Sequence, residues 1–350
     1  TTMVHNIISI LTAFLITLLS TKILLPLSRR LGFVDKPCNR KRHESHTPHI
    51  GGLCMFFGFG FACLTQIAYL TEYRALLAGS AILVFLGVID DSKNLPAKLR
   101  LVGQLVAALL MTSWAGVHIR VFGNILGSGN IHLYHWAVPI TLLAIITFIN
   151  AFNMLDGLDG LAGGIALISL LSMAFLAFLV NPHLTAIKIL LLLSASTLAF
   201  LCFNMRSLFL KKALVFMGDA GSTFLGFALL WFAIELSQAP HNAFNPVIVL
   251  WLLAIPLFDF VSVFSRRLLN RQSPLKADRQ HLHHILLNVG FKHAHATYIM
   301  LGLSAICCGI GIGFQLLALP DYTAFYTFLL AFCVYFSLTY RAYSHDDAAK

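Results

Sequence analysis

TLLAIITFIN-AFNMLDGLDG-LAGGIALISL-LSMAFLAFLV, residues 141–180, consists of two apolar runs with a short polar stretch between them. An apolar run of about 20 residues crosses the hydrocarbon core as a helix, because in lipid each backbone polar group must be bonded within its own segment. The stretch therefore predicts membrane-spanning helices near 136–154 and 160–180, with the polar residues at the membrane surface.

The same pattern runs through the whole chain. Of its 350 residues 58% are hydrophobic and 11% are charged, whereas soluble domains have about 25% charged residues. We therefore expect an all-α integral membrane protein with a single domain over residues 1–350. Runs of sufficient length predict about eleven transmembrane helices. They lie near 5–28, 51–70, 75–89, 99–118, 136–154, 160–180, 185–203, 222–236, 246–264, 297–318 and 322–340.

Lys and Arg are distributed unevenly among the loops. If the loops alternate in side, 20 of the 24 basic residues lie on one side, and only Arg74 and Arg120 lie in the opposite loops. Since basic loops stay in the cytoplasm, this predicts a periplasmic N-terminus and a cytoplasmic C-terminus. It also accounts for the net charge of +10 without a nucleic-acid partner. Besides the C-terminal tail, the cytoplasmic loops lie near 29–50, 90–100, 150–160, 204–221 and 265–296.

Asp90 and Asp91 follow an apolar run, so the pair lies where a span meets the cytoplasm. An ordinary polar helix end is the alternative, but two carboxylates at a helix C-terminus oppose the helix dipole. Adjacent like charges favour a metal ion or a shared proton. The pair is therefore a candidate for catalysis.

The polar stretch after residue 149 places Asn150, Asn153, Asp156 and Asp159 at intervals of three residues. If the stretch is helical, the four side chains form one polar stripe. A solvated loop is the alternative, but it does not require two amides and two carboxylates in register. Gly157 within the stretch allows a ligand or another backbone to approach closely.

Two further aspartates differ in their surroundings. Asp219 lies in a glycine-flanked turn at a span start, where a helix cap and a metal ligand are equally good interpretations. Asp259 lies inside an apolar run with no second acid nearby, and we expect an internal structural partner for it. The pair Gly51-Gly52, at another span start, predicts a close approach of backbone.

The basic loop near 265–296 contains Arg279 and three histidines, His281, His283 and His284. Zinc would explain the histidines, but neither an HExxH motif nor a cysteine partner is present. Phosphate binding fits better, because basic and imidazole groups donate hydrogen bonds to phosphate oxygens. Lys41 lies in a similar basic loop, whose charge the topology alone explains.

Carboxylates, amides and basic groups at one membrane face suit a reaction between a lipid phosphate and a soluble phosphate ester. Such a reaction uses Mg²⁺, or Mn²⁺, to neutralise oxygens, and an acid/base group to deprotonate the attacking atom. The chain has no Walker A, GxGxxG or GxSxG motif. A secondary transporter is the main alternative class, but its acids would lie near the bilayer midplane.

The motifs resemble those of the polyprenyl-phosphate N-acetylhexosamine-1-phosphate transferases, from about Gly32 to Gly290. The histidine segment is similar to that of bacterial members that begin O-antigen or common-antigen synthesis. Muramoyl-pentapeptide transferases instead have a lysine three residues after the aspartate pair, where this chain has Asn94. Five linked motifs carry the resemblance: Asp90-Asp91, Asn153-x-x-Asp156-Gly-x-Asp159-Gly, Asn204, Phe216-Met-Gly-Asp219-x-Gly-Ser222 and His281-x-His283-His284.

The resemblance implies transfer of GlcNAc-1-phosphate from UDP-GlcNAc to undecaprenyl phosphate at the bacterial inner membrane, with the active site facing the cytoplasm. Another UDP-N-acetylhexosamine or UDP-MurNAc-pentapeptide stays open as the donor, and a homodimer is consistent with the family. The implied roles are catalysis for Asp90 and Asp91; Mg²⁺ binding for Asp219 and Asn153; nucleotide binding for Asp156, Gly157, Asp159, Asn204 and Phe216; and phosphate or sugar binding for Arg279, His281, His283, His284 and Lys41.

Overall fold

The computed structural model describes residues 2–31, 47–65, 67–206, 210–271 and 281–348, which are helical almost throughout. No strand occurs within these ranges, only one isolated antiparallel bridge between Val121 and His132. The helices are α1 (Thr2–Leu31), α2 (Gly51–Leu64), α3 (Ile67–Lys93), α4 (Ala97–Leu109), α5 (Ala137–Leu155), α6 (Leu161–Val180), α7 (Thr185–Asn204), α8 (Gly218–Ser237), α9 (Ile248–Leu252), α10 (Ala254–Leu269), α11 (Leu282–Asn288), α12 (His293–Leu316) and α13 (Asp321–Ala348).

In the described part of the chain, eight helices are long and apolar enough to cross a membrane: α1, α3, α5, α6, α7, α8, α12 and α13. The other three predicted spans fall on shorter elements. They are the 14-residue α2, α4 with its π-helical extension Leu110–Trp114, and the pair α9–α10, which breaks at Leu253. An all-helical membrane protein is therefore confirmed. The count of eleven and the orientation of the termini stay predictions, and the predicted span 51–70 was too long because α2 ends at Leu64.

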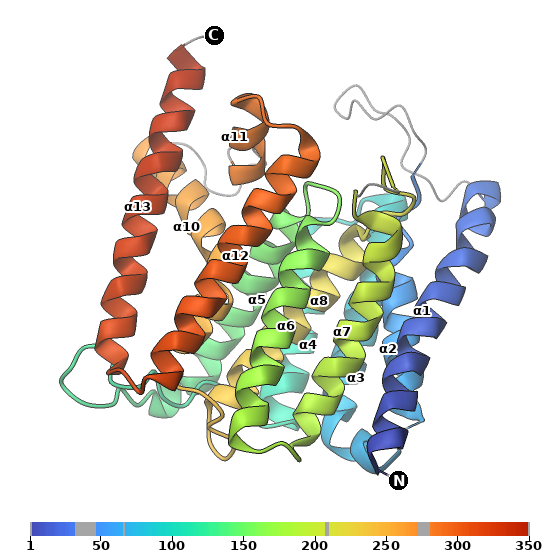
Figure 1. The fold of residues 1–350 in the computed structure, drawn as a ribbon, viewed down its shortest axis with the longest axis horizontal. Helices are drawn as coiled ribbons and strands as arrows, with labels where there is room; N and C mark the ends of the chain where they lie inside the picture. Colours follow the sequence, from blue (N-terminus) through green and yellow to red (C-terminus); the bar gives the residue numbers. More distant parts are fainter. Residues whose placement is uncertain (1, 32–46, 66, 207–209, 272–280, 349–350) are drawn as a thin grey trace.

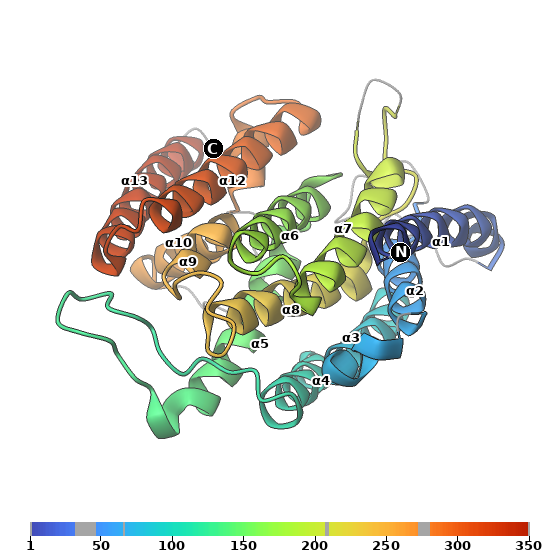
Figure 2. The same ribbon diagram turned by 60° about the horizontal axis from the view of Figure 1, so that its bottom comes forward.

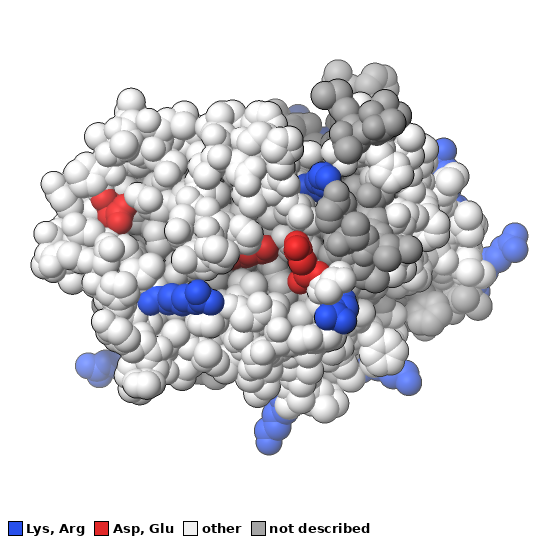
Figure 3. Space-filling model, turned by 90° about the horizontal axis from the view of Figure 1, so that it is seen from below, with Lys and Arg blue, Asp and Glu red and all other residues white. Residues whose placement is uncertain are grey.

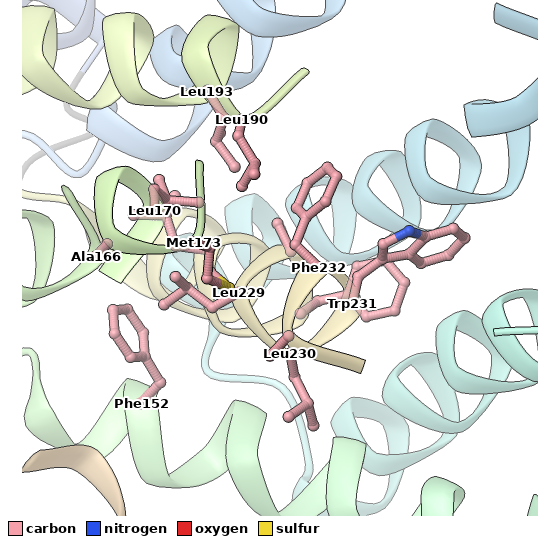
Figure 4. Packing of buried hydrophobic residues seen from close by; sticks show 14 of the residues in the cluster. Phe152, Ala166, Leu170, Met173, Leu190, Leu193, Leu229, Leu230, Trp231 and Phe232 are labelled. Carbon is pink, nitrogen blue, oxygen red and sulfur yellow. The ribbon is translucent and has the colours of Figure 1, made fainter. Parts of the chain in front are cut away.

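Helix α8 lies at the centre of the bundle, among α3, α5, α6 and α7 (Figures 1 and 2), and is the most deeply buried of the eight. Figure 4 shows residues 229–232 of α8 surrounded by side chains of α5, α6 and α7, including Phe152, Met173 and Leu193. Because lipid tails are as apolar as leucine, such helices associate through close van der Waals packing. This packing fixes the position of the first turn of α8.

The two chain termini lie at opposite ends of the bundle (Figure 1). The last turn of α3, the α5–α6 turn and the first turn of α8 meet at the same end as the C-terminus, and we call this the site end. The opposite end, which we call the far end, is the one seen in Figure 3. In this view the Lys and Arg residues are scattered and form no continuous patch, and the loops that the sequence predicts at this end hold only Arg74 and Arg120.

Candidate active site

Asp91, in the last turn of α3, caps the start of α8. Its carboxylate accepts hydrogen bonds from the backbone N–H groups of Asp219 (2.9 Å) and Ala220 (3.4 Å). These groups have no partner within their own helix, so a carboxylate satisfies them and interacts favourably with the helix dipole. Gly218 has a φ of +70°, and a side chain there would collide with Asp91. This close approach joins α3 to α8.

Asp90 is buried beside the carboxyl group of Asp219. Its Oδ1 accepts a hydrogen bond from the N–H of Leu95 (2.6 Å). Its Oδ2 lies 3.3 Å from the Arg100 guanidinium but has no hydrogen-bond partner among the described residues. Because an unbonded buried oxygen is costly, Oδ2 is the atom of this pair that is available to a substrate or a cation.

Asn153 joins α5 to α8 at the same place. Its Nδ2 donates hydrogen bonds to Asp219 Oδ1 and to Ser222 Oγ, both at 2.7 Å. The two helices approach closely here because Gly226 of α8 lies against Phe152 of α5. The predicted metal-binding pair, Asn153 and Asp219, is therefore in direct contact.

The sequence suggested that the helix continues through residues 156–160, but in the structure these residues form a turn. Helix α5 ends at Leu155, so the polar stripe expected for four residues stops at Asn153. Gly160 takes a φ of +79°, and its N–H donates a hydrogen bond to Asn204 Oδ1 (2.7 Å). Asn204 Nδ2 in turn donates to the carbonyl of Val215 (2.9 Å). Asn204 thus ties this turn to the segment before α8, and its nucleotide contact stays a prediction.

The two aspartates of the turn have opposite surroundings. Burial raises the pKa of Asp156 to about 7, and the charges of Asp219, Asp91 and Asp159 add to this effect, while that of His49 opposes it. Asp159 instead accepts a hydrogen bond from Arg206 Nε at 2.6 Å. Asp156 therefore belongs to the group of mutually repelling acids, and Asp159 lies at its edge with a cationic partner.

Segment 48–52 is bonded to the residues just before α8. The N–H of Phe216 donates to the carbonyl of Pro48, and the N–H groups of Gly51 and Gly52 donate to the carbonyls of Phe216 and Met217, at 2.9 to 3.0 Å. A side chain on Gly52 would collide with the backbone at the start of α8, so the close approach predicted for the double glycine is confirmed.

This pairing brings His49 into the site. Its Nδ1 lies 3.2 Å from Asp91 Oδ1, and its ring centroid lies 5.6 Å from that of Phe216. Phe216 therefore borders the acid cluster, and its nucleotide contact stays a prediction.

The three histidines have different environments. His281 Nδ1 lies 2.7 Å from Asp259 Oδ2, which gives Asp259 the internal partner expected from the sequence. His283 packs against Gly157, where a side chain would collide with its ring. Burial, followed by the charge of His284, lowers the pKa of His283 to about 3, so this ring is neutral at pH 7. His283 therefore reaches the turn 156–160 as an uncharged group.

The structure brings Asp90, Asp91, Asn153, Asp156 and Asp219 into one cluster, with the other described candidates around it. Lys41 and Arg279 lie outside the described residues.

Sequence reasoning missed three groups at the site: His49, Arg100 and Arg206. The two arginines had been counted only as charges that set the topology. The sequence carries no signal for their partners, since His49 and Arg206 each contact residues more than 40 positions away.

No three His, Cys, Asp or Glu residues in the described ranges form a set that could hold a metal ion alone. Mg²⁺ in enzymes is commonly bound by one or two carboxylates, with waters and substrate phosphates completing its coordination. Asp219 and Asp90 lie side by side, and Asp90 Oδ2 is buried without a hydrogen bond. The residues therefore fit a divalent cation that arrives together with a phosphate ligand.

Comparison with known proteins gives concordant matches. The family model of glycosyl transferase family 4 matches residues 73–237, which run from α3 to the end of α8. The chain is 34% identical over 319 residues to the undecaprenyl-phosphate alpha-N-acetylglucosaminyl 1-phosphate transferase of Yersinia pestis, covering 87% of this chain and 84% of that protein.

Proteins of the same name from two other bacteria match more of the chain. That of Escherichia coli O157:H7 is 32% identical over 339 residues, with 93% and 89% covered, and that of Haemophilus influenzae is 34% identical over 353 residues, with 95% and 94% covered. The chain therefore belongs to glycosyl transferase family 4 and, as its motifs indicate, to the polyprenyl-phosphate N-acetylhexosamine-1-phosphate transferases.

Proposed function

We propose that the protein transfers GlcNAc-1-phosphate from UDP-GlcNAc to undecaprenyl phosphate, giving undecaprenyl-pyrophosphate-GlcNAc and UMP. The names of its relatives support the acceptor and the sugar phosphate. The observation that carries the proposal is the buried Asp90 carboxyl beside Asp219, whose Oδ2 has no hydrogen bond among the described residues and lies 3.3 Å from the Arg100 guanidinium. One phosphoanhydride replaces another, so the reaction is close to balanced and reversible.

Asp90 and Arg100 serve the lipid acceptor. A phosphate monoester keeps a proton with a pKa of about 6, so at neutral pH part of the acceptor must lose it before its oxygen attacks. Asp90 Oδ2 accepts this proton or orients the phosphate that has lost it. The Arg100 guanidinium, 3.3 Å away on the first turn of α4, moves from the carboxylate to the phosphate, which it can bind through two hydrogen bonds.

The other acids serve the donor. Asp91 holds the first turn of α8 and thereby fixes the position of Asp219. Asp219 and Asn153 would hold Mg²⁺, which when bound neutralises charge on the donor pyrophosphate. The turn 156–160, supported by Asn204 and covered by His283, faces the nucleotide and sugar phosphate.

We also propose an inner-membrane location, with eleven spans and the site end in the cytoplasm. The basic loops of the sequence adjoin the site end, which is the cytoplasmic side by the positive-inside rule. The nucleotide sugar is then reached from the cytoplasm and the polyprenyl phosphate from the inner leaflet. The product would begin a cell-surface polysaccharide such as an O-antigen or common antigen.

The test is a transfer assay with purified protein, undecaprenyl phosphate, Mg²⁺ and UDP-GlcNAc labelled in the sugar. We expect labelled lipid and UMP in equal amounts, and UMP added to purified product should regenerate UDP-GlcNAc. UDP-GalNAc and UDP-MurNAc-pentapeptide are tested in parallel as donors. A preference for one of these would change the donor but keep the reaction class, whereas no transfer from any of them would refute the proposal.

A further inference from the structure

A shallow pocket of about 610 Å³ lies at the turn between α11 and α12. It is separate from the acid cluster and shares no residue with the site described above. The pocket is lined by Gly290, Phe291, Lys292, His295, Tyr298 and Ile299. Most of these residues lie on one face of the start of α12, at spacings of three to four residues.

The pocket lies at the site-end terminus of a candidate span, which is the level expected for lipid headgroups. Helix α12 is one of the candidate spans, and the turn before it is at the site end of the bundle. Phe291 and Tyr298 are large side chains with 43% and 49% of their surface exposed. Aromatic side chains gather at this level of a membrane protein, because the ring prefers the boundary between apolar and polar regions.

The chemistry of the pocket fits an anionic amphiphile. Lys292 and His295 supply donors for a phosphate, and no acidic residue is among the lining residues. The rest of the lining is apolar or aromatic. Basic pockets at the cytoplasmic side of transmembrane helices recognise anionic lipid headgroups in this way.

The outward face of α12 below the pocket is open at two glycine positions. Gly302 and Gly309 follow Tyr298 on this face, and a side chain added at either glycine would meet no atom within 4 Å. This open strip gives an acyl chain a place to lie against the helix backbone directly beneath the basic residues. A soluble anion would make no use of it.

We propose that an anionic phospholipid of the cytoplasmic leaflet binds here, with its phosphate on Lys292 and His295 and an acyl chain along Gly302 and Gly309. The same turn of α12 holds the edge of the active site. Tyr298 donates its hydroxyl hydrogen to the carbonyl of Arg206 (2.9 Å). The lipid therefore steadies the segment that carries the cationic partner of Asp159.

The experiment measures which lipids the purified protein retains. Protein is reconstituted in nanodiscs containing equal phosphatidylglycerol and phosphatidylcholine, and the lipids kept after transfer to mild detergent are counted by native mass spectrometry. We expect enrichment of phosphatidylglycerol in the unaltered protein. The double variant Lys292→Gln/His295→Gln should lose roughly fivefold to thirtyfold of this enrichment, because one or two basic groups near the headgroups contribute on the order of 1 kcal/mol each.

Two further variants separate the pocket from general effects. Lys98→Gln removes an exposed lysine near the same end of the bundle and should keep the enrichment. Gly302→Leu places a side chain on the open surface at Gly302 without changing charge and should reduce retention of the lipid. Equal enrichment in the double variant, or an equal loss in Lys98→Gln, would overturn the proposal. Displacement of the lipid by millimolar glycerol phosphate would also overturn the proposal, because a soluble headgroup would then be enough for binding. The readout is binding, so it is independent of the proposed transfer reaction.

Discussion

Helices α3 and α8 bring acidic residues together at both ends of the bundle, with opposite results. At the far end, Glu235 accepts hydrogen bonds from Tyr73 Oη (2.7 Å) and Trp231 Nε1 (2.9 Å), one on each carboxylate oxygen. At the site end, Asp90 and Asp219 face each other, and Asp90 Oδ2 has no hydrogen bond among the described residues. A buried acid with all its bonds made holds helices together. A buried carboxylate such as Asp90, with one oxygen left without a hydrogen bond, is arranged for a ligand.

The largest expected effect comes from Asp90→Asn. The amide keeps the shape of the side chain but cannot take a proton from the acceptor, so transfer should fall about a thousandfold, within the range of general acid–base groups. Binding of UDP-GlcNAc, measured by calorimetry, should change little. Glu235→Gln is the matched control at the far end, and its turnover should be near that of the unaltered protein. Near-normal turnover of Asp90→Asn would remove Asp90 from the mechanism.

Arg100→Gln tests the cation beside Asp90. A hydrogen bond to a charged group contributes about 1.5–3 kcal/mol, so the KM for undecaprenyl phosphate should rise roughly tenfold or more. The KM for UDP-GlcNAc should stay the same. Lys98→Gln, two residues away in α4 and also exposed, controls for the loss of charge at the membrane surface. Equal shifts in the two KM values would show that Arg100 does not distinguish the acceptor.

Tyr73→Phe tests the far end. It removes the hydroxyl that bonds Glu235 and leaves a buried carboxylate oxygen with fewer partners, which should lower stability by about 1–3 kcal/mol. Thermal unfolding in one detergent would measure this change. Turnover per folded molecule should be unaffected, because the site lies at the other end of both helices. A loss of turnover without a loss of stability would contradict the structural role of this end.

The fold was largely readable from the sequence because lipid permits few alternatives. A chain in the bilayer must bond its own backbone, so each long apolar run became a helix. Some predicted spans are not single continuous helices. Their breaks have local causes that a hydropathy pattern does not show. Segment 246–264 breaks at Leu253, where the backbone leaves helical geometry between α9 and α10.

The site was readable only in part. Adjacent acids at a span end are conspicuous in a sequence, and Asp90 and Asp91 were identified for this reason. The different contacts of the two acids depend on where the first turn of α8 packs. Asp91 accepts hydrogen bonds from backbone groups 128 and 129 residues away. Asp156 and Asp159 left the expected helical stripe because α5 ends at Leu155 and the backbone of Asp156 is no longer helical, with a ψ of 62°. Such contacts follow from packing, which spacing alone does not specify.

The last expected effect concerns pH and the acid cluster. The folded protein raises the pKa of Asp156 from an ordinary 3.8 to about 7. Because the folded state holds this proton more tightly, Asp156 favours folding below about pH 4, and the contribution is lost as pH rises through 7. Thermal midpoints measured in chelator should therefore decline between about pH 4 and pH 7, and Asp156→Asn should flatten the decline. If Asp156→Asn showed the full decline, the decline would come from other titratable groups. Asp156 would then not be one of the mutually repelling acids at the site end.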